Sequence, residues 1–375
     1  MRGRRRNRVE RFADAPLDGA LLEVEDVYTT FETDRGLVRA VDGVTFSLER
    51  GKTLGVVGES GCGKSVLSRS IMGLLANNGK RTGRIVFEGR DLAHASTDEL
   101  RSYWGAQMAM VFQDPMTSLN PVIRIGKQIT ESLRHHMDVS KEFADESALA
   151  LLQSVGIPEA KRRMREYPHQ LSGGMRQRVM IAIALACGPK LLFADEPTTA
   201  LDVTVQAQIL DLLQAQQRER YMGMVLVTHD LGVVAGRTDD IAVMYAGRFV
   251  ETAPTRTLFA HVRHPYTEAL LKSIPKIAQR SHTRLDVISG RPPDLVNPPP
   301  GCKFAPRCPY AQTRCLTEEP ALAEGDTPGH AYRCFYPVGT EAGRDALARN
   351  LAAGQTAAGT FVQGEAGAVV TSGVT

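Results

Sequence analysis

The sequence Gly-Glu-Ser-Gly-Cys-Gly-Lys-Ser at residues 58–65 decides the fold of this chain. A short apolar run at 54–57 precedes it and is typical of a buried strand, while residues 66–72 have the spacing of a packed helix. A glycine-rich loop between strand and helix turns its backbone N–H groups inward, at the positive end of the helix. Lys64 would reach the β- and γ-phosphates, and the Ser65 hydroxyl would bind Mg²⁺. The stretch therefore predicts a loop that binds a nucleoside triphosphate rather than a glycine-rich turn that binds nothing.

Length and composition are those of a globular protein with one large domain and a smaller one. The chain has 375 residues, of which 43% are hydrophobic and 23% are charged. No apolar run reaches the roughly 18 residues that a membrane span needs, and no apolar segment follows the N-terminal arginines as a signal peptide requires. The net charge of +3 gives no general case for nucleic-acid binding. We expect residues 1–20 to form a basic, flexible arm and the protein to stay in the cytosol.

The order of the apolar segments predicts an α/β fold. Residues 21–28 and 40–48 alternate apolar and polar side chains, as strands of a half-buried antiparallel layer do, and we expect residues 31–36 to form a loop between them. Helical character dominates from about residue 117 to 187. The strands that follow alternate with helices, which predicts a parallel sheet covered on both faces. Further strands are expected at 84–88, 107–112, 191–194, 224–228 and 241–244.

Two strand ends carry the side chains expected to act on the nucleotide. Asp195 and Glu196 follow the apolar strand at 191–194 and would face the loop from the carboxyl edge of the sheet. We expect Asp195 to hold Mg²⁺ and Glu196 to polarise the attacking water; capping the next helix is the alternative role. His229 follows the strand at 224–228, and we expect it to contact the γ-phosphate and hold Glu196 in place.

A second anion-binding turn lies at residues 171–177, Leu-Ser-Gly-Gly-Met-Arg-Gln, where a hydroxyl and free N–H groups open a helix. Two phosphate sites in one chain suggest that two chains share two nucleotides. Together with the loop at 58–65 and the strand-end motifs, this turn gives an ordered set that resembles the nucleotide-binding subunit of an ABC transporter, in which residues 171–177 would be the signature. The resemblance implies an ABC-type P-loop ATPase: a RecA-like parallel sheet core, an antiparallel β subdomain and a helical subdomain at about 115–188, within a cassette at 21–258. Met175 departs from the usual glutamine of the signature.

The resemblance also assigns roles to single residues. It makes Gln113 the Q-loop glutamine and residues 200–202, Ala-Leu-Asp, the D-loop with Asp202. Phe31 is the aromatic expected to stack on adenine, with Tyr28 as the competing assignment. The signature residues implied to contact the partner subunit's ATP are Ser172, Gly173 and Gly174. The implied ATP-binding residues are Phe31, Ser60, Gly61, Gly63, Lys64, Ser65, Val66, Gln113 and Asp195; the implied Mg²⁺ ligands are Ser65, Gln113 and Asp195; and the implied catalytic residues are Gln113, Glu196 and His229.

Several stretches are similar to the dipeptide/oligopeptide/nickel branch of bacterial importers, namely 112–121, 167–170, 263–267, 298–304 and 307–309. That branch implies two permease subunits, a second, paralogous ABC ATPase, an extracytoplasmic solute-binding protein, and a peripheral location at the cytoplasmic face of the bacterial cell membrane. A soluble ABC ATPase that acts on ribosomes or DNA through a metal-cluster module is the alternative. Such proteins usually hold two cassettes in one chain, whereas this chain has one phosphate-binding loop and one signature.

Four cysteines in a proline-rich segment at 259–338 suggest a metal site, because cytosolic chains rarely keep structural disulfides. They are Cys302, Cys308, Cys315 and Cys334. Four thiolates suit either Zn²⁺ or a [4Fe–4S] cluster. The third interpretation is that the four cysteines are free thiols that bind no metal. Resemblance to the dipeptide importer ATPase, whose C-terminal extension carries such a cluster, favours iron–sulfur. Residues 339–375 show no periodic pattern, and we expect a disordered tail there.

Overall fold

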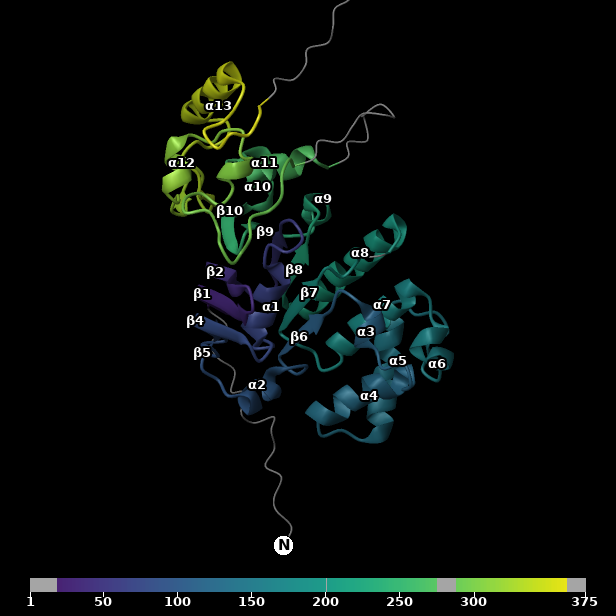
Figure 1. Ribbon diagram of the computed structural model, residues 1–375. Helices are drawn as coiled ribbons and strands as arrows, with labels where there is room; N and C mark the ends of the chain where they lie inside the picture. The colour runs from purple at the N-terminus through teal and green to yellow at the C-terminus, as the bar shows by residue number, and fades with distance from the viewer. Residues whose placement is uncertain (1–18, 200, 275–287, 363–375) are drawn as a thin grey trace, which may run out of the picture.

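The computed structural model describes residues 19–362 apart from residue 200 and residues 275–287. Most of the predicted basic arm (1–18) and the end of the predicted tail (363–375) lie outside the described residues. Two sheets and a group of helices packed beside them make up most of the described chain (Figure 1), and the C-terminal segment adds two short strands to one edge of the larger sheet.

The central sheet has eight strands in the order β11-β12-β10-β9-β3-β8-β7-β6. Strands β9, β3, β8, β7 and β6 are parallel and almost completely buried, which is the pattern of a sheet covered on both faces. The predicted parallel sheet is confirmed, but antiparallel strands extend one edge and make the sheet mixed. Its strands are β3 (Thr53–Val57), β6 (Met108–Val111), β7 (Leu191–Asp195), β8 (Gly223–Thr228), β9 (Asp240–Tyr245), β10 (Arg248–Pro254), β11 (Ala323–Glu324) and β12 (Ala331–Tyr332).

The second sheet is antiparallel, as predicted, with the order β2-β1-β4-β5. Its strands are β1 (Leu22–Thr33), β2 (Gly36–Leu48), β4 (Gly79–Phe87) and β5 (Arg90–Asp91). The prediction of a loop over residues 31–36 was wrong. Strand pairing continues through Phe31 opposite Val38 to Thr33 opposite Gly36, so that only two residues make the turn. The cross-strand ladder therefore overrides the turn-forming composition of this stretch.

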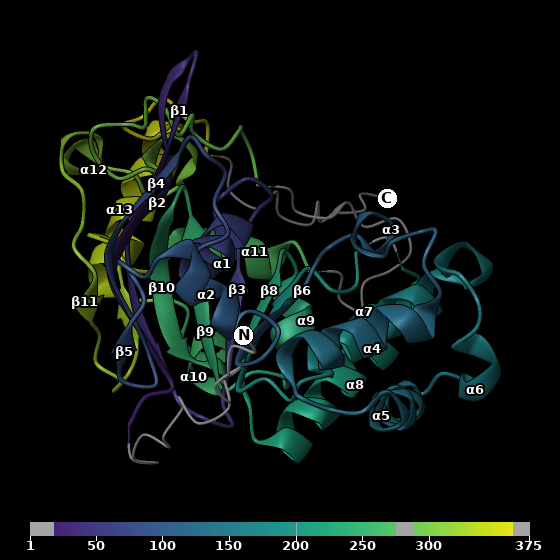
Figure 2. The ribbon, with the colours of Figure 1, turned by 90° about the horizontal axis from the view of Figure 1, so that it is seen from below.

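The helices between β6 and β7 form a group beside the central sheet (Figure 2). Their buried apolar side chains, such as Ile129, Leu152 and Val179, belong to one core with the parallel strands. These helices are α3 (Pro115–Ser118), α4 (Ile125–His136), α5 (Lys141–Ser154), α6 (Ala160–Arg163), the 3-10 turn η2 (Pro168–Gln170) and α7 (Gly173–Leu185).

The remaining helices cover the sheets and the C-terminal segment. They are α1 (Lys64–Met72), α2 (Thr97–Tyr103), α8 (Val203–Arg220), α9 (Leu231–Val234), α10 (Thr255–Ala260), α11 (Pro265–Lys272), the 3-10 turn η3 (Ala305–Arg307), α12 (Thr313–Thr317) and α13 (Glu341–Ala353). Among the described residues, none of the helices combines the length and the apolar character needed to cross a bilayer.

The cysteine-containing segment shares the sheet and the core of the cassette. Strand β12 pairs with β10, with Tyr332 opposite Glu251. Phe304 is 2% exposed, and its ring centroid lies 5.2 Å from that of Tyr245 and 5.4 Å from that of Tyr266. The segment is therefore packed onto the cassette rather than set apart from it.

Helix α13 contradicts the prediction that residues 339–375 form a disordered tail. The Thr340 side chain caps the helix by accepting a backbone hydrogen bond. Ala346 is fully buried, and Asn350 donates to two backbone carbonyls of the cysteine segment at 2.8 and 3.1 Å. Alanine has the highest helix propensity, and a helix face of small side chains docks without the large apolar residues that a periodic pattern needs.

Candidate functional site

The loop at residues 58–65 leads from β3 into α1, as predicted. Gly63 has a φ of 110°, and a Cβ there would lie 2.1 Å from the carbonyl oxygen of Ala40, so that only glycine fits. The Lys64 side chain is 4% exposed and donates to two backbone carbonyls of the loop itself, at 2.8 and 3.0 Å. An ammonium group has three N–H donors, so the loop holds a buried positive charge with a donor to spare.

Ser65 and Asp195 meet as predicted, although 130 residues separate them. The Ser65 hydroxyl, in the first turn of α1, donates to a carboxylate oxygen of Asp195 at 2.8 Å. Asp195 ends β7 and is 1% exposed; burial raises its pKa, and the hydrogen bond from Ser65 opposes that shift. A hydroxyl and a carboxylate side by side are oxygen ligands of the kind that Mg²⁺ prefers, and a cation there would favour the charged carboxylate.

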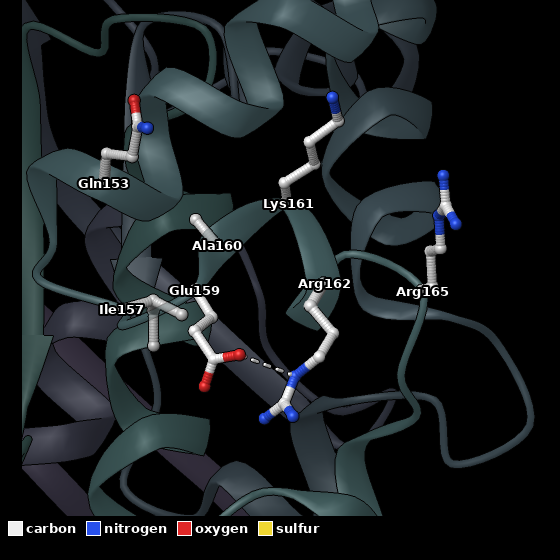
Figure 3. A pocket seen from close by; sticks show the side chains of 7 residues that line it. All are labelled: Gln153, Ile157, Glu159, Ala160, Lys161, Arg162 and Arg165. Carbon is white, nitrogen blue, oxygen red and sulfur yellow. Dashed lines mark ion pairs between the residues drawn. The ribbon is translucent and has the colours of Figure 1, made fainter.

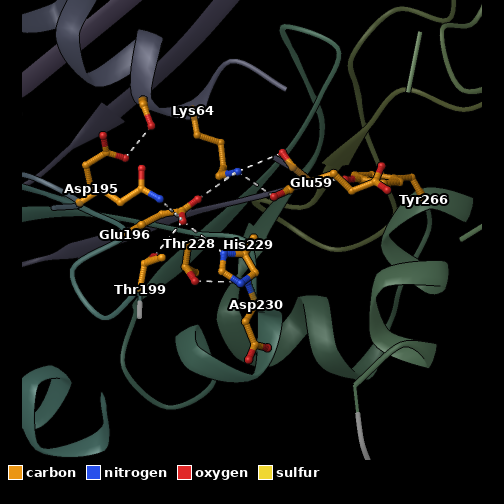
Figure 4. Close-up of polar contacts among 12 residues, drawn as sticks. Glu59, Lys64, Asp195, Glu196, Thr199, Thr228, His229, Asp230 and Tyr266 are labelled. Carbon is orange, nitrogen blue, oxygen red and sulfur yellow. Dashed lines mark hydrogen bonds and ion pairs between the residues drawn. The ribbon is translucent and has the colours of Figure 1, made fainter. Parts of the chain in front are cut away.

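Glu196 lies at the centre of the polar cluster drawn in Figure 4. One carboxylate oxygen accepts from Gln113 at 3.2 Å and from Thr199 at 3.0 Å. The Nδ1 atom of His229 lies 3.4 Å from the same oxygen, and the Lys64 ammonium lies 3.8 Å from the other. Glu196 has a φ of 45°, a left-handed conformation that residues other than glycine rarely adopt. Backbone strain of this kind clusters at functional sites.

A hollow of about 330 Å³ lies in front of the loop. The predicted residues that line it are Phe31, Ser60, Gly61, Gly63, Lys64, Ser65, Val66, Gln113 and Glu196. Three further residues line it without having been predicted, namely Val38, Ala40 and Leu295. Tyr28, the competing aromatic, is not among the lining residues and is 41% exposed. Asp195 and His229 do not line the hollow; Asp195 is buried beside Ser65, whereas His229 is exposed and lies beside Glu196.

The signature residues lie elsewhere in the chain, at the start of α7, and none of the three lines the hollow. The Ser172 side chain caps α7 by accepting from the backbone of Met175 at 3.4 Å. Asp202 of the predicted D-loop caps α8 in the same way at 2.9 Å, while Ala200 lies outside the described residues. A Cβ on Gly174 would lie 2.9 Å from Val205, so the signature packs directly against the start of α8. The signature hydroxyl is thus held at a helix N-terminus away from the loop of its own chain.

The four clustered cysteines line one cavity together with His264, Phe304 and Tyr310. They are Cys302, Cys308, Cys315 and Cys334, and all are free thiols. Burial raises the pKa of each of them, that of Cys302 to about 11. Among the described residues, however, no three His, Cys, Asp or Glu side chains are placed to hold one metal ion. The free volume of about 10 Å³ admits roughly one water-sized atom. The described side-chain positions therefore do not support the predicted iron–sulfur cluster, nor the zinc alternative.

A wider, open hollow of about 730 Å³ lies among α5, α6 and the residues around them (Figure 3). Its lining residues are Gln153, Ile157, Glu159, Ala160, Lys161, Arg162 and Arg165. Glu159 pairs with Arg162 at 3.2 Å within it. None of the predicted motifs contributes a residue, so this hollow is not the candidate site.

Sequence reasoning missed several residues that contact the site. Thr199 follows Glu196 by one turn, and that spacing could have indicated the hydrogen bond. Tyr266 and Arg307 lie in stretches that stood out only for their resemblance. They contact Glu59 of the loop across 207 and 248 residues. No local spacing carries a signal for contacts of that range.

Comparison with known proteins extends these observations. A family model described as "ABC transporter" matches residues 41–199, and one described as "Oligopeptide/dipeptide transporter, C-terminal region" matches residues 250–315. The oligopeptide transport ATP-binding protein OppD of Escherichia coli (strain K12) is 50% identical over 319 residues, which cover 85% of this chain and 94% of that protein. The dipeptide transport ATP-binding protein DppD of the same strain is 49% identical over 329 residues, covering 88% of this chain and 100% of that protein.

A solved structure shows the same likeness in three dimensions. It is the dimeric structure of a post-hydrolysis state of the ATP-binding cassette MJ0796 bound to ADP and Pi, with a TM-score of 0.57 and 28% sequence identity. The match covers 63% of this chain and 99% of that one.

Proposed function

Since this chain belongs to the family of ATP-binding subunits of oligopeptide and dipeptide ABC transporters, we propose that it hydrolyses ATP to power the import of peptides. The observation that carries the proposal is the cluster around Glu196. A strand-end carboxylate lies 3.8 Å from the ammonium of Lys64 and accepts hydrogen bonds from Gln113 and Thr199. Glu196 thus stands beside the position that a phosphate bound to the loop would take.

The loop and its neighbours supply the contacts for a nucleotide with Mg²⁺. Lys64 and the backbone N–H groups of residues 60–66 bind the phosphates. The residues that would hold Mg²⁺ are Ser65, Asp195 and Gln113, and the 2.8 Å contact between the first two fits that role. When bound, the ion supplies positive charge to the β- and γ-phosphates.

Glu196 is the proposed base for the attacking water. Gln113 and Thr199 orient its carboxylate, and His229 lies 3.4 Å from it. This carboxylate therefore has a fixed direction before water or nucleotide arrives, as electrostatic preorganisation requires. We assign His229 to the γ-phosphate side of the same water.

Phe31 is the proposed contact for adenine. It lines the hollow in front of the loop. The ring of Tyr28 instead lies against Gly43, where an added Cβ would approach its hydroxyl to 3.0 Å. These positions support Phe31 over Tyr28.

A second ATPase subunit completes each site in this proposal. Ser172, Gly173 and Gly174 do not line the hollow of their own chain, which supports a role on the nucleotide of a partner. We propose that the partner is a paralogue, that Asp202 lies at the shared interface, and that the helices at about 115–188 receive the permeases. The cassette would span 21–258 and the C-terminal extension 259–338.

The complex would contain two permease subunits and be fed by an extracytoplasmic solute-binding protein. The chain would then lie at the cytoplasmic face of the bacterial membrane as a peripheral subunit, held there by the permeases, with no nucleic-acid partner.

For the four cysteines we propose a [4Fe–4S] cluster, with Zn²⁺ as the alternative metal. The basis of the proposal is the number of thiols, since four free cysteines line one buried cavity. Their side chains would have to turn inward from the described positions to act as ligands. Such a metal would be structural, since metal binding adds folding free energy to a segment with little regular structure.

Purification from native membranes tests the function most simply. The chain should co-purify with polytopic permeases, and the purified complex should hydrolyse ATP. Co-sedimentation with ribosomes or DNA, with no permease attached, would instead support the alternative of a soluble ABC ATPase. The peptide assignment is tested separately, by measuring the uptake of labelled peptides into sealed vesicles.

A further inference from the structure

A bidentate ion pair joins the cysteine segment to the phosphate-binding loop. Two guanidinium nitrogens of Arg307 donate to the two carboxylate oxygens of Glu59 at 2.6 and 2.9 Å. Glu59 is the second residue of the loop, and Arg307 directly precedes Cys308. The Arg307 side chain is 3% exposed and that of Glu59 is 26% exposed, so the guanidinium is shielded from water while the carboxylate is partly exposed. Bidentate pairs of this kind are strong and fix the geometry of both partners.

The backbone of Glu59 is held as well, by a residue of α11. The hydroxyl of Tyr266 accepts from the Glu59 N–H at 2.7 Å (Figure 4). Tyr266 is fully buried, and its ring centroid lies 4.6 Å from that of Tyr245. Tyr245 in turn lies 3.3 Å from Arg307 through its hydroxyl oxygen. The side chain and the backbone of Glu59 are thus both fixed by residues that follow the cassette.

The contacts of Arg307 and Tyr266 with Glu59 also affect the phosphate-binding lysine. The carbonyl oxygen of Glu59 accepts from the Lys64 ammonium at 3.0 Å. A loop that is ordered before its ligand arrives does not lose conformational freedom on binding, and this raises its affinity. Fixing Glu59 therefore favours nucleotide binding at Lys64.

The same segment reaches the hollow at a second point. Leu295 lines the hollow together with Phe31. Its carbonyl accepts from the Arg39 N–H at 3.1 Å, which attaches the segment to β2. One residue earlier, Asp294 pairs with Arg35 at 2.6 Å on the surface. An apolar side chain held beside an aromatic one provides a surface for a nucleotide base.

We propose that the C-terminal segment forms part of the nucleotide site and contributes to ATP binding. Arg307 is a positioning residue that fixes the loop through Glu59, and Leu295 forms part of the wall against which the base lies. This inference rests on the proposed binding of ATP at Lys64.

Equilibrium binding of ATP to the full-length chain tests the role of Arg307. Arg307→Met should weaken ATP binding on the order of tenfold, within the usual range for coupled sites. Arg307→Lys keeps the charge without the fork and should recover part of the loss. Glu59→Gln weakens the same contact from the other side by removing the charge and one of the two acceptor oxygens, so the double variant should lose little more than Arg307→Met alone. If Arg307→Met does not fold, Arg307→Lys and Glu59→Gln carry the test.

A second buried ion pair provides the matched control. Lys303 of the same segment donates to Asp42 at 2.7 Å and to the Ala246 carbonyl at 2.9 Å, and neither Lys303 nor Asp42 lines the hollow. The double variant Lys303→Met with Asp42→Asn should lower the unfolding temperature but leave ATP affinity unchanged. ATP affinity that stays at the wild-type value in Arg307→Met, or that falls equally in the control, would overturn the positioning role. Failure of the wild-type chain to bind ATP would instead contradict the proposed function.

Nucleotides with and without a base test Leu295. Leu295→Ala should weaken ATP binding roughly fivefold, as expected for lost apolar contact, and should leave the affinity for inorganic triphosphate unchanged. Val296→Ala is the control, because Val296 packs near Gly36 and does not line the hollow. Equal effects of the two variants, or an equal loss for inorganic triphosphate, would overturn the assignment of Leu295.

Discussion

The phosphate-binding loop and the cysteine segment lie against each other but are held in place differently. A strand and a helix flank the loop, and glycines in conformations that other residues resist set its shape. The cysteine segment has two strands of only two residues each, and buried side chains such as Phe304 and Arg307 attach it to the cassette. The first kind of structure is encoded locally in the sequence, whereas the second depends on contacts between distant residues.

The largest effect is expected at Glu196. Glu196→Gln keeps the shape of the side chain but removes the charge, so turnover should fall on the order of 10² or more. ATP binding should persist, because Lys64 and Ser65 are untouched. Steady-state hydrolysis and equilibrium ATP binding of the assembled complex provide the two readouts, with the exposed Glu341→Gln on α13 as the control. Turnover near the wild-type value at this subunit's site would rule out Glu196 as the base.

Variants of Lys64 and Ser172 should distinguish ATP binding by one chain from closure of the site between two chains. Lys64→Ala removes a charge-assisted contact and should weaken ATP binding to the isolated chain by about tenfold or more. Ser172→Ala should spare that binding but lower hydrolysis by the complex. Because it also removes a helix cap worth about 1 kcal/mol, its unfolding temperature must be measured alongside. An equal loss of ATP affinity in both isolated variants would contradict a shared site.

The cysteines should affect the segment more than the loop. Cys308→Ser should remove bound iron and acid-labile sulfide from anaerobically purified protein and make the segment sensitive to protease. Nucleotide binding should weaken but not disappear, because the loop keeps its own strand and helix while it loses the contact from Arg307. Cys187→Ser, a half-buried cysteine outside the cavity, is the control. One equivalent of zinc without iron would replace the cluster by the alternative metal, and a protease-resistant segment without any metal would exclude both.

The smallest effect on the site is expected from α13, which packs on the far side of the cysteine segment. Ala346→Asp buries a carboxylate and should lower the free energy of unfolding by about 2 kcal/mol, with ATP affinity unchanged. Ala348→Asp on the exposed face of the same helix should change neither quantity. Thermal unfolding and ATP binding of both variants check this, and a loss of ATP affinity in Ala346→Asp would extend the nucleotide site to the helix.

The sequence predicted what neighbouring residues determine. The loop, its strand and its helix follow from one stretch. Asp195 and Glu196 lie at the same edge of the sheet as the loop, because parallel strands have their carboxyl ends at one edge. Periodicity could not identify α13, whose buried face consists of small residues. The extension of β1 through Phe31 depends on the partner strand rather than on local composition.

Contacts over long range account for the rest. Glu59 looks like an ordinary loop residue until Tyr266 and Arg307 are placed beside it. Leu295 follows a proline-rich stretch and carries no motif, yet it reaches the hollow because its backbone pairs with Arg39. Similarly, the cysteine spacing indicates a set of ligands but does not fix how the thiols converge.

Peptide uptake into sealed vesicles tests the central claim most directly. The complete complex, with its permeases, would be reconstituted so that the ATPase subunits face the ATP-containing side, and entry of labelled di- and oligopeptides would be measured together with phosphate release. We predict uptake that requires ATP and Mg²⁺ and that Glu196→Gln in this subunit abolishes along with hydrolysis. Uptake that continues in the Glu196→Gln complex, or ATP hydrolysis that never moves a peptide, would contradict the account.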